Sequence, residues 1–115
     1  MCLVYLVIVE WTWGIEIPWT TEVGSRLRIF HGTGIVVNGG AKLGNDVTLH
    51  QGVCIGARSS EGGSPIIGNG VHLGAGSMIL GAISVGDNGR IGAGAVVLAD
   101  VPPGKAAVGN PARIL

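Results

Sequence analysis

The fold is decided by the stretch IGNGVHLGAGSMILGAISVGDNGRIGAGAVV, residues 67–97. An aliphatic residue recurs in it at every sixth position, and the same step extends toward the N-terminus: Leu43, Leu49, Ile55, Ile67, Leu73, Ile79, Val85, Ile91 and Val97. An α-helix has a period of 3.6 residues and a β-strand a period of 2, so neither yields a sustained six. A chain that turns a corner every six residues does, and three such faces make one triangular coil. The sequence therefore predicts stacked coils, which form a parallel β-helix.

A second set of small or aliphatic residues should share the interior of the coils. Its members lie four positions after the first set: Val47, Val53, Val71, Ser77, Ile83, Ala95 and Val101. A glycine follows most residues of the first set, and we expect these glycines to supply corner conformations that residues with a Cβ resist. Val23, Ile29 and Ile35 keep the six-residue step in a register offset by two, and we place the slip at residues 38–42.

Length and composition bound the class of protein. With 115 residues and 11.6 kDa, we expect one β-helix domain of about five coils over residues 16–115, after an apolar segment over residues 1–15. Net charge is zero and pI is about 6.8, which argues against nucleic-acid binding. Charged residues make up only 12% of the chain, so we expect outer faces to be buried in an oligomer.

The N-terminal segment is apolar from Leu3 to Val9, far short of the ~20 residues of a membrane-spanning helix. We interpret residues 1–13 as a short helix or strand that packs on the first coil or on a neighbouring subunit, without membrane contact. Attachment to a membrane surface is the alternative. We interpret Cys2 and Cys54 as unpaired thiols of a cytoplasmic protein, with a disulfide as the alternative.

Two further passages interrupt the period. Residues 57–65 replace one aliphatic step by polar residues and should bulge outward, and two proline groups end the coils within residues 101–113. Inserted loops on a regular solenoid are its usual binding surfaces, so function is expected near such breaks.

Several motifs resemble a known family. IGAGAVV (91–97), DVPPG (100–104) and GNPAR (109–113) resemble the C-terminal end of hexapeptide-repeat acyltransferases. FHGTGIVV (30–37) resembles the catalytic segment of their serine acetyltransferase branch, which exopolysaccharide acetyltransferases of the colanic-acid type share. VEWTWGIEI (9–17) is more similar to the second group. The resemblance implies a left-handed β-helix and a homotrimer that binds acetyl-CoA between its subunits.

The resemblance also implies an acyl transfer in which a histidine removes the proton of the attacking hydroxyl. His31 lies at the position of the family's catalytic histidine, and imidazole has a suitable pKa for a general base. Glu16 lies where the family has the aspartate that orients this imidazole. Glutamate has a longer side chain, so this position departs from the family pattern.

Two polar residues are candidates for contacts with the acceptor. Allowing for the two-residue slip, Gln51 lies one coil beyond His31, either beside the reacting hydroxyl and oxyanion or as a ladder position without a role. Asn38, in the first break, is the other candidate. We interpret His50, projecting to the other side, and His72, at a corner, as surface residues. Histidines on different faces do not form a zinc site, so no metal is expected.

For acetyl-CoA, the resemblance points to Ala75 and Ala93, where small residues permit close approach of the pantetheine, and to Arg113 and Lys105.

The acceptor is predicted from two positions at which this chain departs from the serine acetyltransferases. Serine acetyltransferases carry a second active-site histidine and a carboxylate-binding arginine, and here the matching positions are Ser64 and Gly68. Loss of the guanidinium removes bidentate carboxylate recognition. A sugar or polysaccharide hydroxyl is therefore favoured over L-serine, and a non-catalytic assembly coil is the alternative of another class.

Overall fold

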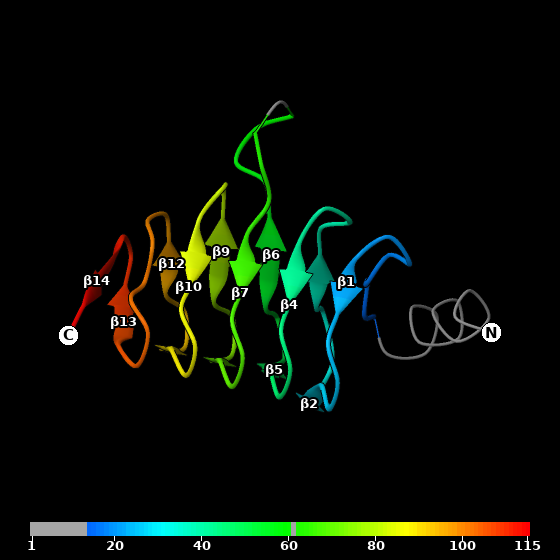
Figure 1. The fold of residues 1–115 in the computed structure, drawn as a ribbon, viewed down its shortest axis with the longest axis horizontal. Helices are drawn as coiled ribbons and strands as arrows, with labels where there is room; N and C mark the ends of the chain where they lie inside the picture. Colours follow the sequence, from blue (N-terminus) through cyan, green and yellow to red (C-terminus); the bar gives the residue numbers. More distant parts are fainter. Residues whose placement is uncertain (1–13, 61) are drawn as a thin grey trace.

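The structure is a solenoid of short strands stacked along one axis (Figure 1). It is a computed structural model that describes residues 14–60 and 62–115. Four complete coils of three strands follow one another: β1 (Glu22–Val23), β2 (Arg28–Phe30), β3 (Val36–Val37); β4 (Lys42–Leu43), β5 (Thr48–His50), β6 (Cys54–Gly56); β7 (Ile66–Ile67), β8 (His72–Leu73), β9 (Met78–Leu80); β10 (Ser84–Val85), β11 (Arg90–Ile91), β12 (Val96–Val97). Strands β13 (Ala106–Gly109) and β14 (Ala112–Ile114) end the chain.

Equivalent strands of successive coils form three sheets, one for each face of the prism. Their orders are β1-β4-β7-β10, β3-β6-β9-β12 and β2-β5-β8-β11-β13-β14. Every pair is parallel except β13 with β14. Incomplete turns add a bridge from Glu16 to Val36 and another from Val101 to Val85. The predicted parallel β-helix is confirmed, with four complete coils flanked by partial turns. The short N-terminal helical segment lies outside the described residues.

The core is the column of aliphatic side chains inside the prism. Both predicted interior sets lie there, and most members are fully buried, including Leu49, Ile55, Leu73 and Ile79. Three residues predicted to lie inside deviate: Ile29 and Ile83 are only partly buried, and Val23 is 38% exposed. Val23 belongs to β1, which among the described residues is the first strand of its sheet and pairs with β4. At the same end, Ile15 already belongs to the core.

The two-residue register slip was predicted at the wrong corner. Phe30 pairs with His50, twenty residues on, whereas Val37 pairs with Ile55, only eighteen residues on. The two extra residues therefore lie within residues 31–34, and the segment 38–42 keeps the regular step. Ile35 and Val37 are both buried, and Val37 holds the position that the six-residue pattern assigned to Ile35. An aliphatic pattern could not distinguish these two residues.

The glycines that follow core residues serve close packing rather than unusual dihedral angles. Gly68 and Gly74 do not have positive φ, but a Cβ on Gly74 would lie 2.7 Å from the nitrogen of Ala93 in the next coil. On Gly68 it would lie 2.8 Å from the nitrogen of Asp87. Positive φ occurs instead two residues later, at Gly70 and Gly76. The predicted role of glycine in corner conformations therefore applies to Gly70 and Gly76, whereas Gly68 and Gly74 are required by close packing.

The segment 57–65 leaves the prism as a protruding loop between β6 and β7, as predicted (Figure 1). Lys42 pairs with Ile66, twenty-four residues on, whereas Ile66 pairs with Ser84, eighteen residues on. The loop therefore adds six residues to one coil without changing its strands. The described residues contain no helix that is long and apolar enough to cross a membrane.

Ser77 is the one interior residue whose hydroxyl has no partner in the described part of the chain. It occupies the interior position that Ala95 fills in the next coil, and its side chain is fully buried. A buried hydroxyl without a hydrogen bond carries a desolvation penalty of ~1–3 kcal/mol. We therefore expect Ser77→Ala to raise the free energy of unfolding by about 1 kcal/mol. Urea denaturation at one fixed protein concentration measures this change, and a loss of stability would show that the hydroxyl is satisfied in solution.

Candidate functional site

The prism has three corners, and the predicted site residues are distributed among them. The first corner follows β1, β4, β7 and β10; the second follows β2, β5, β8 and β11; the third follows β3, β6, β9 and β12. Because equivalent corners stack, residues at one corner form an edge that runs the length of the solenoid.

The second corner brings together four of the predicted residues. Backbone hydrogen bonds connect its successive coils: Gly52 N donates to Thr33 O, Gly76 N to Gln51 O, and Gly94 N to Ala75 O, at 2.9, 2.9 and 2.8 Å. Gln51, Ala75 and Ala93 therefore lie one above the other, in line with Thr33. His31 begins the same corner, and the two extra residues place it ahead of Thr33 rather than directly in line with Gln51.

His31 stands on a corner whose base is firmly packed. Its side chain is exposed, and its φ of 53° lies in the left-handed region, which is uncommon for residues other than glycine. Thr33 N donates a 2.7 Å hydrogen bond to His31 O. Gly32 is buried against Ile15 and Ile29, where a Cβ would lie 2.6 and 2.7 Å from their side chains. An exposed imidazole on a packed, widened corner is well placed to meet a substrate hydroxyl.

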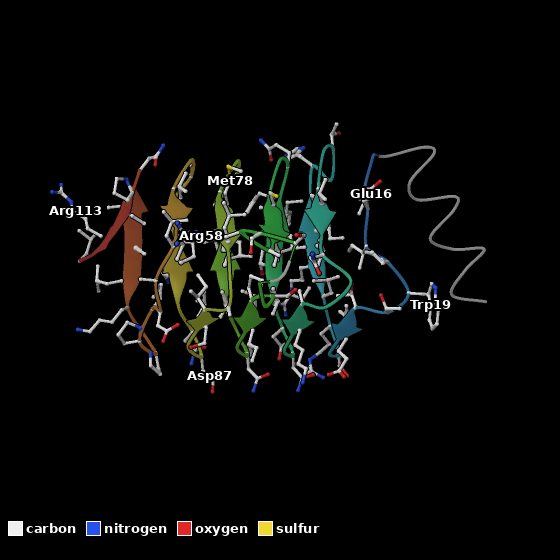
Figure 2. The ribbon with its side chains drawn as sticks, turned by 90° about the horizontal axis from the view of Figure 1, so that it is seen from above. Glu16, Trp19, Arg58, Met78, Asp87 and Arg113 are labelled. Atoms are coloured by element: carbon white, nitrogen blue, oxygen red, sulfur yellow. The ribbon has the colours of Figure 1, made fainter. Side chains whose placement is uncertain are left out.

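Glu16 lies on the face that adjoins this corner. Its backbone pairs with Val36 through Glu16 N to Ile35 O at 2.7 Å and Val37 N to Glu16 O at 2.8 Å. The side chain points outward, on the same side of the prism as Met78 (Figure 2). Within the described ranges, ion pairs of 4.0 Å or less join Asp46 to Arg26 and Arg28, and none joins Glu16 to His31. The orienting role of Glu16 stays a prediction.

The corner position predicted for His72 was wrong. His72 lies in strand β8, not at a corner, and pairs across the sheet with Thr48 and Arg90. His50 lies in β5 and faces outward on the same sheet, where its Nε2 is 3.1 Å from Nε2 of His72. The register pairs Thr48 with His72 and Leu49 with Leu73, so His50 and His72 meet diagonally across the two strands.

A third ring completes this group. Phe30, which pairs with His50, stacks on the His50 ring with centroids 5.4 Å apart and 22° between planes. Burial is the main cause that lowers the pKa of His72 below its usual value of 6.5, and the neighbouring His50 and Arg90 lower it further. The sequence contained a signal for this group. Phe30, His50 and His72 each lie next to an inward-facing aliphatic residue of their strand, so all three face outward on the same sheet.

The third corner holds Asn38 and Ser64, so one chain does not bring them to His31. Asn38 Oδ1 accepts hydrogen bonds from Gly40 N at 2.7 Å and from Ser64 Oγ at 2.9 Å, and Thr21 Oγ1 donates to Asn38 O at 3.1 Å. These contacts fasten the base of the 57–65 loop. In the same loop, the Arg58 side chain passes over Gly81 and lies at the centre of Figure 2.

The two predicted basic residues near the C-terminus lie at different places. Lys105 is exposed at the first corner, where its carbonyl accepts a hydrogen bond from Arg90 N. Arg113 is exposed in β14, paired with Val108 of β13, and projects at the C-terminal end of the solenoid (Figure 2). Ala75 and Ala93 are therefore on the His31 edge, Arg113 lies beyond the last coil, and Lys105 is on another edge.

The sheet of β3, β6, β9 and β12 carries an apolar column on its outer side. Val36, Cys54, Met78 and Val96 pair in register along it, and Val36 and Met78 are 41% and 37% exposed. Partial burial raises the pKa of the Cys54 thiol, so this cysteine is a neutral, largely apolar member of the column. We name these four residues the apolar column.

Residues 14–60 and 62–115 contain no group of three or more His, Cys, Asp or Glu side chains that could hold a metal ion.

Comparison with known proteins supports the sequence-based resemblance. The family described as bacterial transferase hexapeptide (six repeats) matches residues 64–99. WcaB of Escherichia coli K12, whose name assigns it to colanic acid biosynthesis as an acetyltransferase, is 42% identical over 61 residues, which cover 53% of this chain and 38% of WcaB.

Two solved structures share the fold at substantial identity. Soybean serine acetyltransferase apoenzyme is 40% identical with a TM-score of 0.91, over 98% of this chain and 48% of that one. Serine acetyltransferase from Brucella abortus in complex with coenzyme A is 41% identical with a TM-score of 0.81, over 84% of this chain and 39% of that one. This chain thus spans about half the length of these relatives or less. The fold is the left-handed β-helix of these structures, and the chain carries hexapeptide repeats over residues 64–99 and resembles the serine acetyltransferase branch of the acyltransferases.

Proposed function

We propose that this chain is an acetyl-CoA-dependent O-acetyltransferase that acts on a hydroxyl of a sugar or polysaccharide precursor. The observation that carries the proposal is the exposed imidazole of His31 on a widened, packed corner, on the same edge as Gln51, Ala75 and Ala93. The likeness to acetyltransferases, one of them in complex with coenzyme A, supports the choice of donor.

In this proposal His31 acts as the general base. Its imidazole removes the proton of the acceptor hydroxyl while the oxygen attacks the thioester carbonyl carbon. The carbon–sulfur bond then breaks, and the imidazolium returns the proton to the departing thiolate. Gln51, one step along the same edge, is the candidate donor to the oxyanion, where a single donor typically contributes a factor of ~10²–10³ in rate.

Coenzyme A would lie along the second corner, from His31 toward the C-terminal coils. Ala75 and Ala93 leave the backbone accessible there, and Arg113 lies beyond the last coil as a cation for its phosphates. Lys105, on the first corner, would reach the same ligand only if it were supplied by another subunit.

The acceptor assignment depends on what replaces the carboxylate anchor. The hydroxyl of Ser64 donates a hydrogen bond to Asn38, and Gly68 packs against the next coil. Neither residue carries the positive charge that would bind a carboxylate. L-serine remains the second candidate, because the soybean serine acetyltransferase has the same fold at 40% identity. A panel of acceptors with release of free CoA as the readout separates them: saturable turnover with L-serine would favour serine acetylation, and turnover with sugars would favour the proposal.

We also propose a homotrimer, in which the third corner of one chain faces the second corner of another. The apolar column offers a surface for such contacts, and one chain alone keeps Asn38, Ser64 and Arg58 on a different edge from His31. A shared site between two subunits would unite them.

The general-base role predicts a large loss of activity when the imidazole is removed. We expect His31→Ala to lower the rate of acetyl transfer by ~10²–10⁴-fold, the usual contribution of such a base. Steady-state release of CoA measures it, with Lys42→Ala on another face as the matched control. A loss of only a few-fold in a folded His31→Ala protein would reject the base role. Calorimetry that detects no CoA binding to folded wild-type protein would favour the non-catalytic assembly coil.

The hydrogen bonds of Asn38 allow its two possible roles to be separated. Asn38→Ala removes bonds to Gly40 and Ser64, and Ser64→Ala removes only one of them. At ~0.5–1.5 kcal/mol for each bond, Asn38→Ala should destabilise the protein by about twice as much. If Asn38 also binds the acceptor, its replacement raises the acceptor KM well beyond the effect of Ser64→Ala. Equal KM values in the two variants would restrict Asn38 to fastening the loop.

The trimer proposal predicts which apolar residue is buried between subunits. Met78→Glu places a charge within the apolar column and should shift the protein toward monomers in analytical ultracentrifugation. Ile66→Glu is the matched control, because Ile66 is 53% exposed but lies on another face, beside Lys42 and Ser84. Unchanged sedimentation of Met78→Glu, or dissociation by Ile66→Glu instead, would refute this interface.

A further inference from the structure

Three aromatic rings form a continuous row on the outer face of the sheet that leads into the second corner. Phe30 of β2 stacks on His50 of β5, and His50 contacts His72 of β8 with ring centroids 4.8 Å apart and planes tilted by 51°. The mechanism above uses none of the three. The row nevertheless ends at the residue that precedes His31.

The contact between the two histidines limits how many protons they can carry. Their Nε2 atoms are 3.1 Å apart, a hydrogen-bond distance, so one nitrogen must donate its proton and the other must accept it. An intact pair therefore carries at most one proton more than two neutral imidazoles. If both rings were protonated, two N–H groups would face each other and the contact would break.

The surroundings of the pair are electropositive. Arg90 of β11 pairs with His72, Arg28 of β2 pairs with Thr48, and Asp46, at the corner before β5, is bound to Arg26 at 2.8 and 2.9 Å. In the described ranges no carboxylate lies within 4.0 Å of either imidazole. Burial first, and then His50 and Arg90, lower the pKa of His72. The environment therefore favours the neutral pair.

The row supports the corner that carries His31. Strand β2 has β5 as its neighbour at this end of the sheet, so the His50 ring is the surface on which Phe30 rests. Phe30 and His31 are consecutive, and the backbone at His31 has a φ of 53° in a corner with two extra residues. A shift of Phe30 is transmitted directly to the backbone of His31. Displacements of about 1 Å at a catalytic group cost up to ~10²-fold in rate.

We propose that His50 and His72 are positioning residues for His31, acting through Phe30, and that double protonation of the pair releases this support. The proposal rests on the proposed function of His31. Because burial and the charges of His50 and Arg90 hold the pKa of His72 below 6.5, His72 stays neutral above pH 6.5, where the contact and its contribution to stability are fully present. That contribution is lost as the pH falls below 6.5 through the folded-state pKa of His72, whose proton completes double protonation. Acid should thus weaken activity through this pair.

The pH dependence of kcat/KM between pH 5 and 8 tests the proposal. For the wild-type protein we expect a steeper acid limb than in His72→Gln, because release of the support requires a proton on His72 in addition to those taken up elsewhere. His72→Gln keeps a hydrogen-bonding group that does not titrate, so it should retain most of the plateau with a shallower limb. His72→Phe keeps a ring without nitrogens and should lower the plateau about tenfold. Equal slopes in wild type and His72→Gln would overturn the proposal.

Two arginine variants test the positioning role without changing either histidine. Arg90→Gln removes a cation that lowers the pKa of His72, so the acid limb should move to higher pH. Arg28→Gln removes a cation from the same face that does not act on His72, and should leave the limb in place. The proposal is contradicted if Arg90→Gln leaves the pH of the acid limb unchanged, or if both variants shift it equally.

Side-chain NMR separates this proposal from the proposed function. Histidine ¹⁵N–¹H correlations follow His50 and His72 without any substrate, and we expect the Gly32 amide to shift with the His72 titration, also in His31→Ala. If the protein transfers acetyl groups but Gly32 does not follow His72, the positioning role fails alone. If Gly32 follows His72 but no acetyl transfer occurs with any donor, the proposed function fails and the coupling stands.

Discussion

Backbone pairing between successive coils is the constraint on which the rest of the structure depends. Each strand must lie about 4.8 Å from its equivalents, so every coil must return to the same three faces. Extra residues can therefore leave the prism only at a corner. The chain uses this freedom twice: two residues widen the corner at His31, and six build the loop between β6 and β7. The candidate catalytic residue and the most prominent loop are both products of this one rule.

The sequence predicted the core residues of the regular coils well, but it predicted the register slip and the roles of the glycines less well. Leu49, Ile55 and Leu73 lie in the core because a six-residue step leaves an aliphatic side chain no other place. The register slip was misplaced because Ile35 and Val37 are both aliphatic and both buried. Similarly, Gly74 follows the pattern for backbone reasons that the pattern alone does not reveal: the next coil passes too close for a Cβ.

For the candidate site, the corner of His31, Gln51, Ala75 and Ala93 follows from coil arithmetic together with family resemblance. The contact between His50 and His72 does not, because it joins side chains that lie diagonally, not directly opposite, on two paired strands. Asn38 shows the opposite case. Sequence reasoning gave it a contact with substrate, whereas in the chain its side chain already binds Gly40 and Ser64. Polar residues at breaks can serve the loop itself as readily as a ligand.

Strand β14 changes the edge that the longest sheet presents at the C-terminal end. A stack of parallel strands ends in open backbone groups, and such an edge can recruit a further chain of the same kind. Here β14 turns back and runs antiparallel to β13, so the sheet's last row no longer repeats the pattern of the coils beneath it. A second solenoid placed end-on would meet a strand of opposite direction rather than a continuation of its own. On this face of the prism, the hairpin therefore changes the strand direction that the edge presents to a neighbouring chain.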